Sequence, residues 1–330
     1  MISSRTPFRI SLFGGGTDFP DWYKENNGMV ISGTIDKYCY VNVRKLPAIW
    51  DFNFRLRYYK TEQVKKINQI KHAPYREIIK HFNFEKEKIE IIHTADLPAL
   101  SGLGASSSST VAAIQALSLL KGVLLSKKQL SQLAIFIEQK KLKENVGSQD
   151  QIAAAFGGFN KISFKKDLDF TVEELLTNEK IDLLNKSTFL VYTGIQRKGQ
   201  KIEKEKISNI RNKKLENNLN NIMKITNKAF SEFNKKKINL KKIGKLLNDQ
   251  WEEKKKLSKN ITNPTINKIN KVCLLNGAYG SKLLGAGGGG FILVLCPSNK
   301  KKKLMKKLAK FKIVNFRFEN AGSTIIYKKT

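Results

Sequence analysis

The sequence predicts a mixed α+β fold built from two lobes. In its first third, short β-rich segments alternate with glycine-containing turns, whereas long helical patterns dominate after residue 198. The regular strand–helix alternation of a doubly wound parallel sheet is absent. Hydrophobic residues make up 41% of the 330 positions, which is enough for a large core. Collagen-like, rod-like and fully disordered chains are excluded by this composition.

The first half of the chain carries strand and helix patterns in close succession. Apolar residues at Val111, Ile114 and Leu117 share one helical stripe, and Gly157-Gly158 ends a helical pattern. Strands are predicted at Arg5–Phe13, Met29–Ile35, Tyr38–Arg44, Lys88–Thr94 and Phe159–Phe164. Helices are predicted at Asp18–Asn26, Ser106–Leu120, Leu130–Lys141 and Gln149–Phe156.

The second half is richer in helices. Long helical patterns cover Lys198–Lys237, Leu240–Leu257, Pro264–Asn276 and Asn299–Lys310. Strands are predicted at Lys186–Tyr192, Gly290–Cys296, Lys312–Phe318 and Ser323–Tyr327. No repeat and no Gly/Ser linker interrupts the chain, so we place the lobe boundary near Ser163–Lys186. This division gives an N-terminal domain at 1–170 and a C-terminal domain at 171–330.

The net charge of +33 is the most conspicuous compositional feature. A basic surface attracts nucleic acid, anionic lipid or small anionic substrates. However, only nine of the 61 basic residues are arginine, the residue that base recognition favours, and the lysines occur among many Asn and Ile residues. We interpret the charge as a compositional bias and expect no nucleic-acid partner.

Other global features indicate a cytoplasmic protein. The longest fully apolar run is Phe291–Cys296, far below the roughly 20 residues that cross a membrane, so we expect no membrane partner. The N-terminal residues lack the apolar core of a secretory signal. The cysteines Cys39, Cys273 and Cys296 stand far apart, so neither a disulfide framework nor a zinc site is predicted. The sequence does not indicate an oligomeric state.

The segment Leu97–Thr110 is the most informative part of the chain. A Gly/Ser loop with Gly102 and Gly104 runs directly into a helix, where free amide groups and the helix dipole favour an anion. Serine is also common at helix starts, so a simple capping role is the alternative. Four consecutive serines exceed what a cap requires, and we therefore predict a phosphate-binding loop.

A second glycine-rich segment is Gly285–Gly290. It matches the G-x-G-x-x-G pattern of dinucleotide-binding sites, but a strand pattern follows it where such a site needs a helix. A tight turn alone does not need so many glycines. We expect this backbone to pack closely against a ligand or another loop.

Charged side chains near the predicted loops are further candidates. Arg9 lies in an apolar strand, where burial requires a partner, and Asp18 follows a glycine run. Asp150 begins a predicted helix, and Glu138 lies on the preceding one. From the residues alone, Arg9 is equally compatible with an edge strand, Asp150 with a dipole-stabilising position, and Glu138 with an ordinary surface residue.

Taken in this order, the segments resemble the GHMP small-molecule kinases over nearly the whole chain. The family's first motif, Pro-x-Lys/Arg followed by glycine and Thr-Asp, matches Pro7, Arg9, Gly14, Thr17 and Asp18. The second, P-x-x-x-G-L-G-S-S, matches from Pro98 to Ser106, with Ala105 in place of the first serine. Gly285–Gly290 matches the third. The resemblance implies a ribosomal-protein-S5-domain-2-like N-terminal lobe and a ferredoxin-like C-terminal lobe.

The resemblance also implies a reaction and its cofactors. Strings such as Gly14–Asp18, Gly147–Asn160 and Tyr192–Arg197 are most similar to the family's kinases of anomeric sugar hydroxyls. The expected reaction is phosphorylation of a heptose 7-phosphate by ATP with Mg²⁺. A fucokinase-like or other neutral-sugar 1-kinase is the first alternative, and a branch acting on mevalonate or homoserine is another.

Roles for individual residues follow from the same resemblance. Asp150 would accept the proton of the attacking hydroxyl, and Arg9 would stabilise the Asp150 carboxylate and the transferred phosphate. Mg²⁺ would be held by Ser106 and Glu138, with Ser107 in reserve. ATP would be bound by Pro98, Ser101, Gly102, Leu103, Gly104, Ala105, Ser106, Ser107 and Ser108. The sugar phosphate would be bound by Asp18, Thr17, Gly16, Arg197, Gly287 and Gly288.

A basic RNA-binding protein is the competing class. The segment Asp51–Lys60 combines aromatic and basic residues, but it lacks the RNP pattern of an RNA-binding sheet. We interpret it as an edge strand or as part of a nucleotide or sugar pocket.

Overall fold

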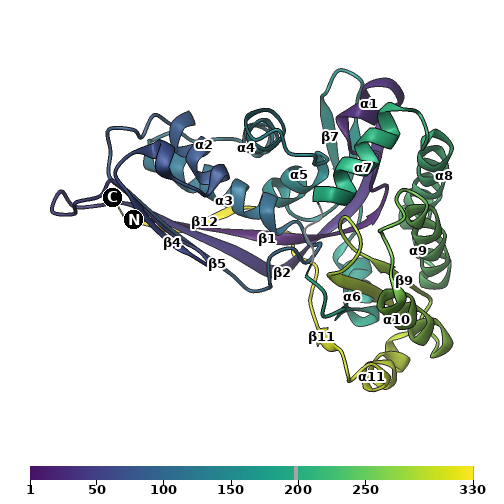
Figure 1. Ribbon diagram of the computed structural model, residues 1–330. Helices are drawn as coiled ribbons and strands as arrows, with labels where there is room; N and C mark the ends of the chain where they lie inside the picture. The colour runs from purple at the N-terminus through teal and green to yellow at the C-terminus, as the bar shows by residue number, and fades with distance from the viewer. Residues whose placement is uncertain (197–199, 330) are drawn as a thin grey trace.

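The computed structural model describes residues 1–196 and 200–329, which form two β-sheets covered by helices (Figure 1). The larger sheet lies beneath α2, α3, α4 and α5, and the smaller one packs with α9 and α10 at the other end of the molecule. None of the described helices is long and apolar enough to cross a membrane. The site described below lies where the two parts meet.

The larger sheet is built mainly from the first half of the chain. Its central strand order is β12-β1-β2-β5-β3-β4, and β6 pairs with both β2 and β7. The strands are β1 (Ile2–Phe13), β2 (Gly28–Lys45), β3 (Phe54–Arg57), β4 (Thr61–Val64), β5 (Ile89–Ala95), β6 (Phe159–Phe164), β7 (Phe170–Glu174) and β12 (Thr324–Lys328). The associated helices are α1 (Pro20–Asn26), the 3₁₀ helix at Ile67–Gln69, α2 (Ala73–His81), α3 (Ala105–Leu120), α4 (Lys127–Ile135), a π-helix at Phe136–Lys141 and α5 (Gln149–Phe156).

The smaller sheet has the order β11-β8-β10-β9 and is antiparallel throughout its described pairs. Its strands are β8 (Thr188–Tyr192), β9 (Gly280–Leu283), β10 (Phe291–Leu295) and β11 (Lys312–Val314). The helices of this half are α6 (Asn178–Ser187), α7 (Gln200–Arg211), α8 (Glu216–Phe233), α9 (Leu240–Lys255), α10 (Pro264–Leu275) and α11 (Ser298–Lys307).

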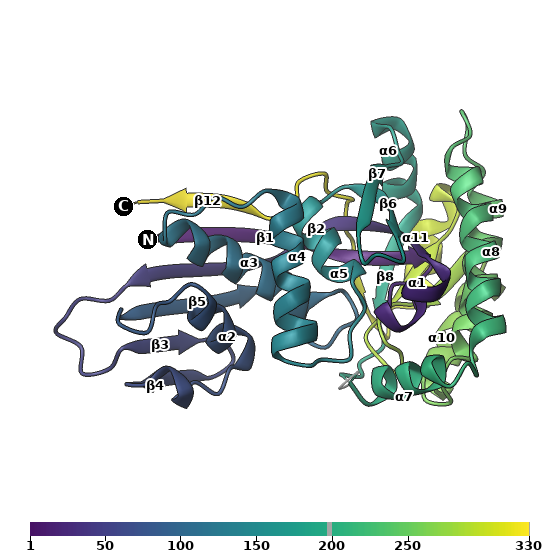
Figure 2. The ribbon, with the colours of Figure 1, turned by 90° about the horizontal axis from the view of Figure 1, so that it is seen from above.

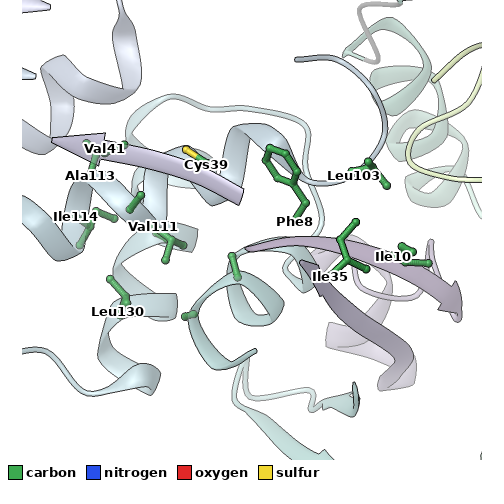
Figure 3. Packing of buried hydrophobic residues seen from close by; sticks show 14 of the residues in the cluster. Phe8, Ile10, Ile35, Cys39, Val41, Leu103, Val111, Ala113, Ile114 and Leu130 are labelled. Atoms are coloured by element: carbon green, nitrogen blue, oxygen red, sulfur yellow. The ribbon is translucent and has the colours of Figure 1, made fainter. Parts of the chain in front are cut away.

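The core of the larger sheet forms where α3 packs on β1 and β2. Phe8 and Val41 from the strands and Val111 and Ile114 from the helix are all fully buried (Figure 3). Apolar side chains cover this face of the helix, and its serines and threonine at 107–110 are buried as well. This packing fixes the N-terminus of α3 against β1, which carries Arg9.

The last strand of the chain returns to the first sheet. β12 pairs antiparallel with the start of β1, so the two ends of the chain lie side by side (Figure 2). The Thr6 and Ser323 hydroxyls are hydrogen bonded at 2.6 Å where the returning chain reaches β1. The larger sheet therefore draws on both ends of the sequence, and the division at residue 170 stays a prediction.

Most of the predicted elements are present, with several corrections. The two strands expected at Met29–Ile35 and Tyr38–Arg44 are one long strand, β2, whose two halves pair with β6 and β5. The helix expected at Leu130–Lys141 is α4 followed by a π-helix. Within the described part of Lys198–Lys237, α7 and α8 are separated at 212–215. The segment Asp51–Lys60 contains β3, but this strand lies between β5 and β4 and is not an edge strand. Short strands and helices without a long pattern were not predicted: β4, α2, β7, α6 and β9.

Candidate active site

A cavity of about 230 Å³ lies between the two halves of the molecule. It is lined by backbone and side chains from the β1–α1 loop, the loop before α3, the start of α5 and the β9–β10 turn. Side chains from α7 and α9 complete the lining. The four sequence segments singled out above, far apart in the chain, thus contribute to one space.

Arg9 and Asp150 form a two-pronged ion pair in this cavity. The Arg9 Nε and Nη2 groups donate to Asp150 Oδ1 and Oδ2 at 2.7 and 2.6 Å. The third contact of the guanidinium is to the Gly102 carbonyl at 2.7 Å. Arg9 is 5% exposed, whereas the Asp150 side chain is 24% exposed. The carboxylate is thus oriented by arginine and still open to the cavity.

The loop before α3 brings bare backbone to the ion pair. Gly104 precedes the first residue of α3 with φ of 74°, a left-handed conformation that glycine adopts without strain. A Cβ atom at this position would stand 3.1 Å from Arg9 Cγ and 3.4 Å from Asp150 Oδ2. Ser101, Gly102, Gly104, Ala105 and Ser106 line the cavity. An anion at this helix N-terminus would face the ion pair.

The two glycine-rich loops pack directly against each other. A Cβ atom on Gly285 would come within 2.4 Å of Gly102 Cα, and one on Gly290 within 2.3 Å of the Ser101 carbonyl oxygen. The Phe291 amide donates to that carbonyl at 3.1 Å. The turn from Gly285 to Gly290 joins β9 to β10 in an antiparallel hairpin. The expectation of close backbone packing is confirmed, and the partner is the loop before α3.

Asp18 is buried near the end of the β1–α1 loop, just before α1 begins. Its Oδ1 atom accepts from the Gly16 amide and its Oδ2 atom from Gln149 Nε2, both at 2.9 Å. Burial raises the pKa of Asp18, although these two donors act in the opposite direction. Gly147 has no room for a side chain, because a Cβ atom there would lie 1.9 Å from Asp18 Oδ2. The segment before α5 therefore holds Asp18 in the cavity wall.

Glu138 lies in the π-helix that follows α4. Its Oε2 atom accepts from Ser107 Oγ at 2.9 Å and from Gln151 Nε2 at 2.5 Å. Its Oε1 atom makes no hydrogen bond of ordinary geometry among the described residues, although the Thr110 hydroxyl is close enough to lower the pKa of the carboxyl. Burial and the nearby Glu144 carboxylate raise the pKa of Glu138 to about 7. A π-helical turn often marks a functional position. The buried unpaired oxygen is suited to a cation.

The described residues contain no cluster of three or more His, Cys, Asp and Glu side chains that could hold a metal. Mg²⁺ needs only one or two protein oxygens when it also binds phosphates and water. Glu138, with its unpaired oxygen, and the adjoining Ser107 hydroxyl fit that requirement. Ser106, the serine first expected in this role, is exposed and lines the cavity.

Ser107 and Glu138 are buried and do not line the cavity, and the remaining predicted site residues divide between the cavity wall and positions outside it. Pro98 is exposed, Leu103 is fully buried in the core, and the Ser108 hydroxyl donates to the Pro7 carbonyl at 2.9 Å. The Thr17 hydroxyl donates to the Gly14 and Met29 carbonyls, so it closes the β1–α1 loop. Gly16 and Gly287 line the cavity, whereas Gly288 contacts Ile261 and Asn263. Arg197 lies outside the described residues.

Sequence reasoning missed three lysines of the cavity wall. Lys206 from α7, Lys254 from α9 and Lys282 from β9 are buried there. In a chain this rich in lysine, composition gives no reason to single out any of them. Only Lys282 could have been noticed in the sequence, because it precedes Leu283-Leu284 and the glycine run in a segment otherwise suited to burial.

Known proteins are similar to this chain over most of its length. The family model "GHMP kinases N terminal domain" matches residues 69–158, and "GHMP kinases C terminal" matches residues 229–313. A D-glycero-alpha-D-manno-heptose 7-phosphate kinase of Campylobacter jejuni is 29% identical, with 97% of each chain covered. A mevalonate kinase of Methanocaldococcus jannaschii is 30% identical, with 73% of each chain covered.

Solved structures share the fold. A crystal structure described as a D-glycero-D-manno-heptose 1-phosphate kinase from Bacteroides thetaiotaomicron aligns over the full length of both chains. Its TM-score is 0.76 at 24% sequence identity. This likeness confirms the two-lobed α+β architecture that the sequence predicted.

Proposed function

The chain belongs to the GHMP kinase family, and we propose that it transfers the terminal phosphate of ATP to the anomeric hydroxyl of D-glycero-D-manno-heptose 7-phosphate. Membership in the family makes it a phosphotransferase with a hydroxyl acceptor. The similarity to the Campylobacter jejuni heptose 7-phosphate kinase supports the choice of sugar.

The observation that carries the mechanism is the Arg9–Asp150 pair beside the N-terminus of α3. Phosphoryl transfer depends mainly on positioning and on charge stabilisation. The bare backbone at Gly102 and Gly104 and the dipole of α3 would hold the phosphates of the nucleotide. Arg9 already contacts both Asp150 and the Gly102 carbonyl, so one side chain links the phosphate loop to the carboxylate.

Asp150 would act on the acceptor hydroxyl. The hydroxyl oxygen attacks the terminal phosphorus of ATP, the bond from that phosphorus to the ADP oxygen breaks, and the hydroxyl proton passes to Asp150. Arg9 would then stabilise negative charge on the transferred phosphate. Asp18, held by Gly16 and Gln149, would accept hydrogen bonds from sugar hydroxyls.

Glu138 and the Ser107 hydroxyl would hold Mg²⁺. Bound there, the ion would neutralise charge on the nucleotide phosphates. We retain Ser106 as a ligand of the nucleotide, because it lines the cavity at the start of α3.

A panel of acceptors tests the proposed function. ADP formation is measured with ATP and Mg²⁺ for heptose 7-phosphate, heptose, fucose, galactose, mannose, mevalonate and homoserine. We expect the highest kcat/KM with heptose 7-phosphate. If free heptose or fucose is used equally well, a neutral-sugar 1-kinase is the better assignment. Preferential use of mevalonate or homoserine would contradict the sugar assignment altogether.

A further inference from the structure

Lys254 and Lys282 are buried lysines that reach the same cavity from different elements. Lys254 lies on α9 and is 7% exposed, and Lys282 lies on β9 and is 2% exposed. Both line the cavity that contains Arg9 and Asp150. The proposed mechanism uses neither of these two lysines.

The hydrogen bonds of the two ammonium groups go to backbone carbonyls. Lys282 Nζ donates to the carbonyls of Ser11 and Leu12 at 3.1 and 2.6 Å. Lys254 Nζ donates to the carbonyls of Leu283 and Gly285 at 2.9 and 2.5 Å. In its protonated form each lysine has three N–H donors, so these bonds leave one donor for a ligand. An anion that binds there also favours the protonated form of the amine.

Neither lysine has a carboxylate partner among the described residues, unlike the other cations of the cavity. Arg9 is paired with Asp150, and Lys206 Nζ lies 2.6 Å from Glu203 Oε2. Burying an unpaired charge is costly unless an anion compensates it. Consistent with this cost, burial lowers the pKa of Lys282 to about 7 and that of Lys254 well below its ordinary value.

The backbone contacts connect the lysines to the segments that the proposed function assigns to the acceptor and to the nucleotide. The Ser11 carbonyl that Lys282 contacts belongs to β1, the strand that also carries Arg9 and leads to Asp18. Lys254 contacts Gly285, whose backbone packs against Gly102 of the phosphate loop. An anionic group at these lysines would therefore lie beside both the acceptor segment and the phosphate loop.

We infer that Lys254 and Lys282 form a subsite for phosphoryl oxygens in the cavity. The inference rests on the proposed kinase function and deepens it. Two sources offer this chemistry: the phosphate that the acceptor sugar already carries, and the phosphate that is transferred from the nucleotide. In either case the incoming anion supplies the negative charge that the protein itself does not provide.

Anion binding tests the subsite without requiring turnover. Inorganic phosphate is titrated by calorimetry into the protein alone and into protein saturated with ADP, which fills the phosphate loop. We expect binding to wild type in both states and at least 10-fold weaker binding to Lys254→Met and Lys282→Met. Lys256→Met is the matched control, because Lys256 lies just beyond α9 with a side chain that is 57% exposed. Unchanged phosphate affinity in both cavity variants would overturn the subsite.

Gln variants provide a second test in case the Met variants do not fold. Lys254→Gln and Lys282→Gln keep a donor for the backbone carbonyls but remove the charge. Circular dichroism establishes that each variant is folded before phosphate is titrated. A folded Gln variant should show the same loss of phosphate affinity as the Met variant. Wild-type phosphate affinity in both folded Gln variants would overturn the subsite even if the Met variants do not fold.

Steady-state kinetics then distinguishes the two sources of phosphate. A rise in KM for heptose 7-phosphate, with KM for free heptose unchanged, assigns the subsite to the acceptor's phosphate. An equal fall in kcat with both acceptors assigns it to the transferred phosphate. Unchanged kinetic constants with both acceptors would overturn the inference. If wild type phosphorylates no sugar yet binds phosphate through the lysines, the proposed function fails and the anion subsite stands.

Discussion

At the scale of single residues, the site depends on charged side chains that the fold holds at fixed distances from one another. Arg9 is buried, and its guanidinium contacts one carboxylate and one carbonyl, so removal of Asp150 would leave a buried cation without its partner. In the proposed mechanism Asp150 would take the proton, and Arg9 would position Asp150 and face the phosphate.

The first prediction concerns Asp150. Asp150→Asn keeps the size of the side chain but cannot accept the proton, so kcat should fall by about 100-fold or more. ATP affinity should be nearly unchanged, because the nucleotide phosphates are held by the loop before α3. Asp167→Asn, in the exposed turn between β6 and β7, is the control. Turnover of Asp150→Asn at the wild-type rate would exclude the proposed role.

The second prediction concerns the stability of the ligand-free protein. Because burial lowers the pKa of Lys282 from its ordinary value of 10.5 to about 7 in the folded protein, the unfolded state holds more protons between these values. Stability should therefore rise with pH above about 7, by at most about 1.4 kcal/mol per pH unit for this group. Urea unfolding of wild type and Lys282→Gln at pH 6 and pH 9 measures the difference. Parallel pH profiles of the two proteins would show that Lys282 does not titrate in this range.

At the scale of elements, the N-terminus of α3 and the π-helix set the geometry of the proposed phosphate site. α3 is fixed by its packing on β1 and β2, so Gly104 stands close to the ion pair: a Cβ atom there would lie 3.1 Å from Arg9 Cγ and 3.4 Å from Asp150 Oδ2. The π-helix brings Glu138 to Ser107, on the first turn of α3.

The third prediction concerns Gly104. Gly104→Val should weaken ATP binding at least 10-fold, because its side chain would stand between the nucleotide phosphates and the ion pair. Gly122→Val is a matched control: Gly122 also has a positive φ, of 80°, but a Cβ atom there meets nothing within 4 Å. Both variants therefore carry similar backbone strain, and calorimetric titration with ATP compares them. Equal ATP affinities would place the nucleotide elsewhere.

The fourth prediction concerns Glu138. Glu138→Gln removes the charge that would bind Mg²⁺, so the Mg²⁺ concentration for half-maximal rate should rise several-fold. Glu252→Gln, on the exposed face of α9, serves as the control. Initial rates are measured over a range of Mg²⁺ at fixed ATP. If the Mg²⁺ dependence is the same in all three proteins, Glu138 has a structural role only.

The sequence predicted where the helices and strands of the site lie better than it predicted which of their side chains face the cavity. The ranges of α5 and β6 match the structure, and the loop before α3 was located from its glycines and serines. One residue along a helix turns a side chain by about 100°, so choosing between Ser106 and Ser107 required the register of α3 on the sheet. The π-helix around Glu138 has no signature in apolar spacing, which is why the helix was expected to continue to Lys141.

Residues defined by burial were beyond the reach of the sequence. Arg9 could be singled out because a cation in an apolar strand needs a partner, and the structure supplies Asp150. Lys254 and Lys282 are chemically the same as the exposed lysines around them, and tertiary packing alone separates the two groups. Likewise, the sequence indicated a strand at Asp51–Lys60 but not its place in the sheet, because β3 is flanked by β5 and by the short strand β4.

At the scale of the whole molecule, the basic charge and the site are separate features. Arg44 and Arg55 in the larger sheet form ion pairs with the buried Glu90. Arg55, which lies in the segment Asp51–Lys60, is therefore part of an internal ion network. The cavity instead concentrates three buried lysines and one buried arginine where the two sheets meet. We expect these four basic side chains to govern the affinity for phosphorylated ligands, because a bound anion favours the protonated form of the buried lysines, while the exposed lysines contribute little.

The central claim is that the protein phosphorylates the anomeric hydroxyl of a sugar that already carries a phosphate. ³¹P nuclear magnetic resonance of the product formed from ATP and heptose 7-phosphate tests it most directly. We expect two sugar phosphate signals of equal intensity: the original 7-phosphate and a new phosphate whose phosphorus couples to the anomeric proton. A new phosphate coupled to any other proton, or ATP that remains unconsumed with this sugar, would contradict it.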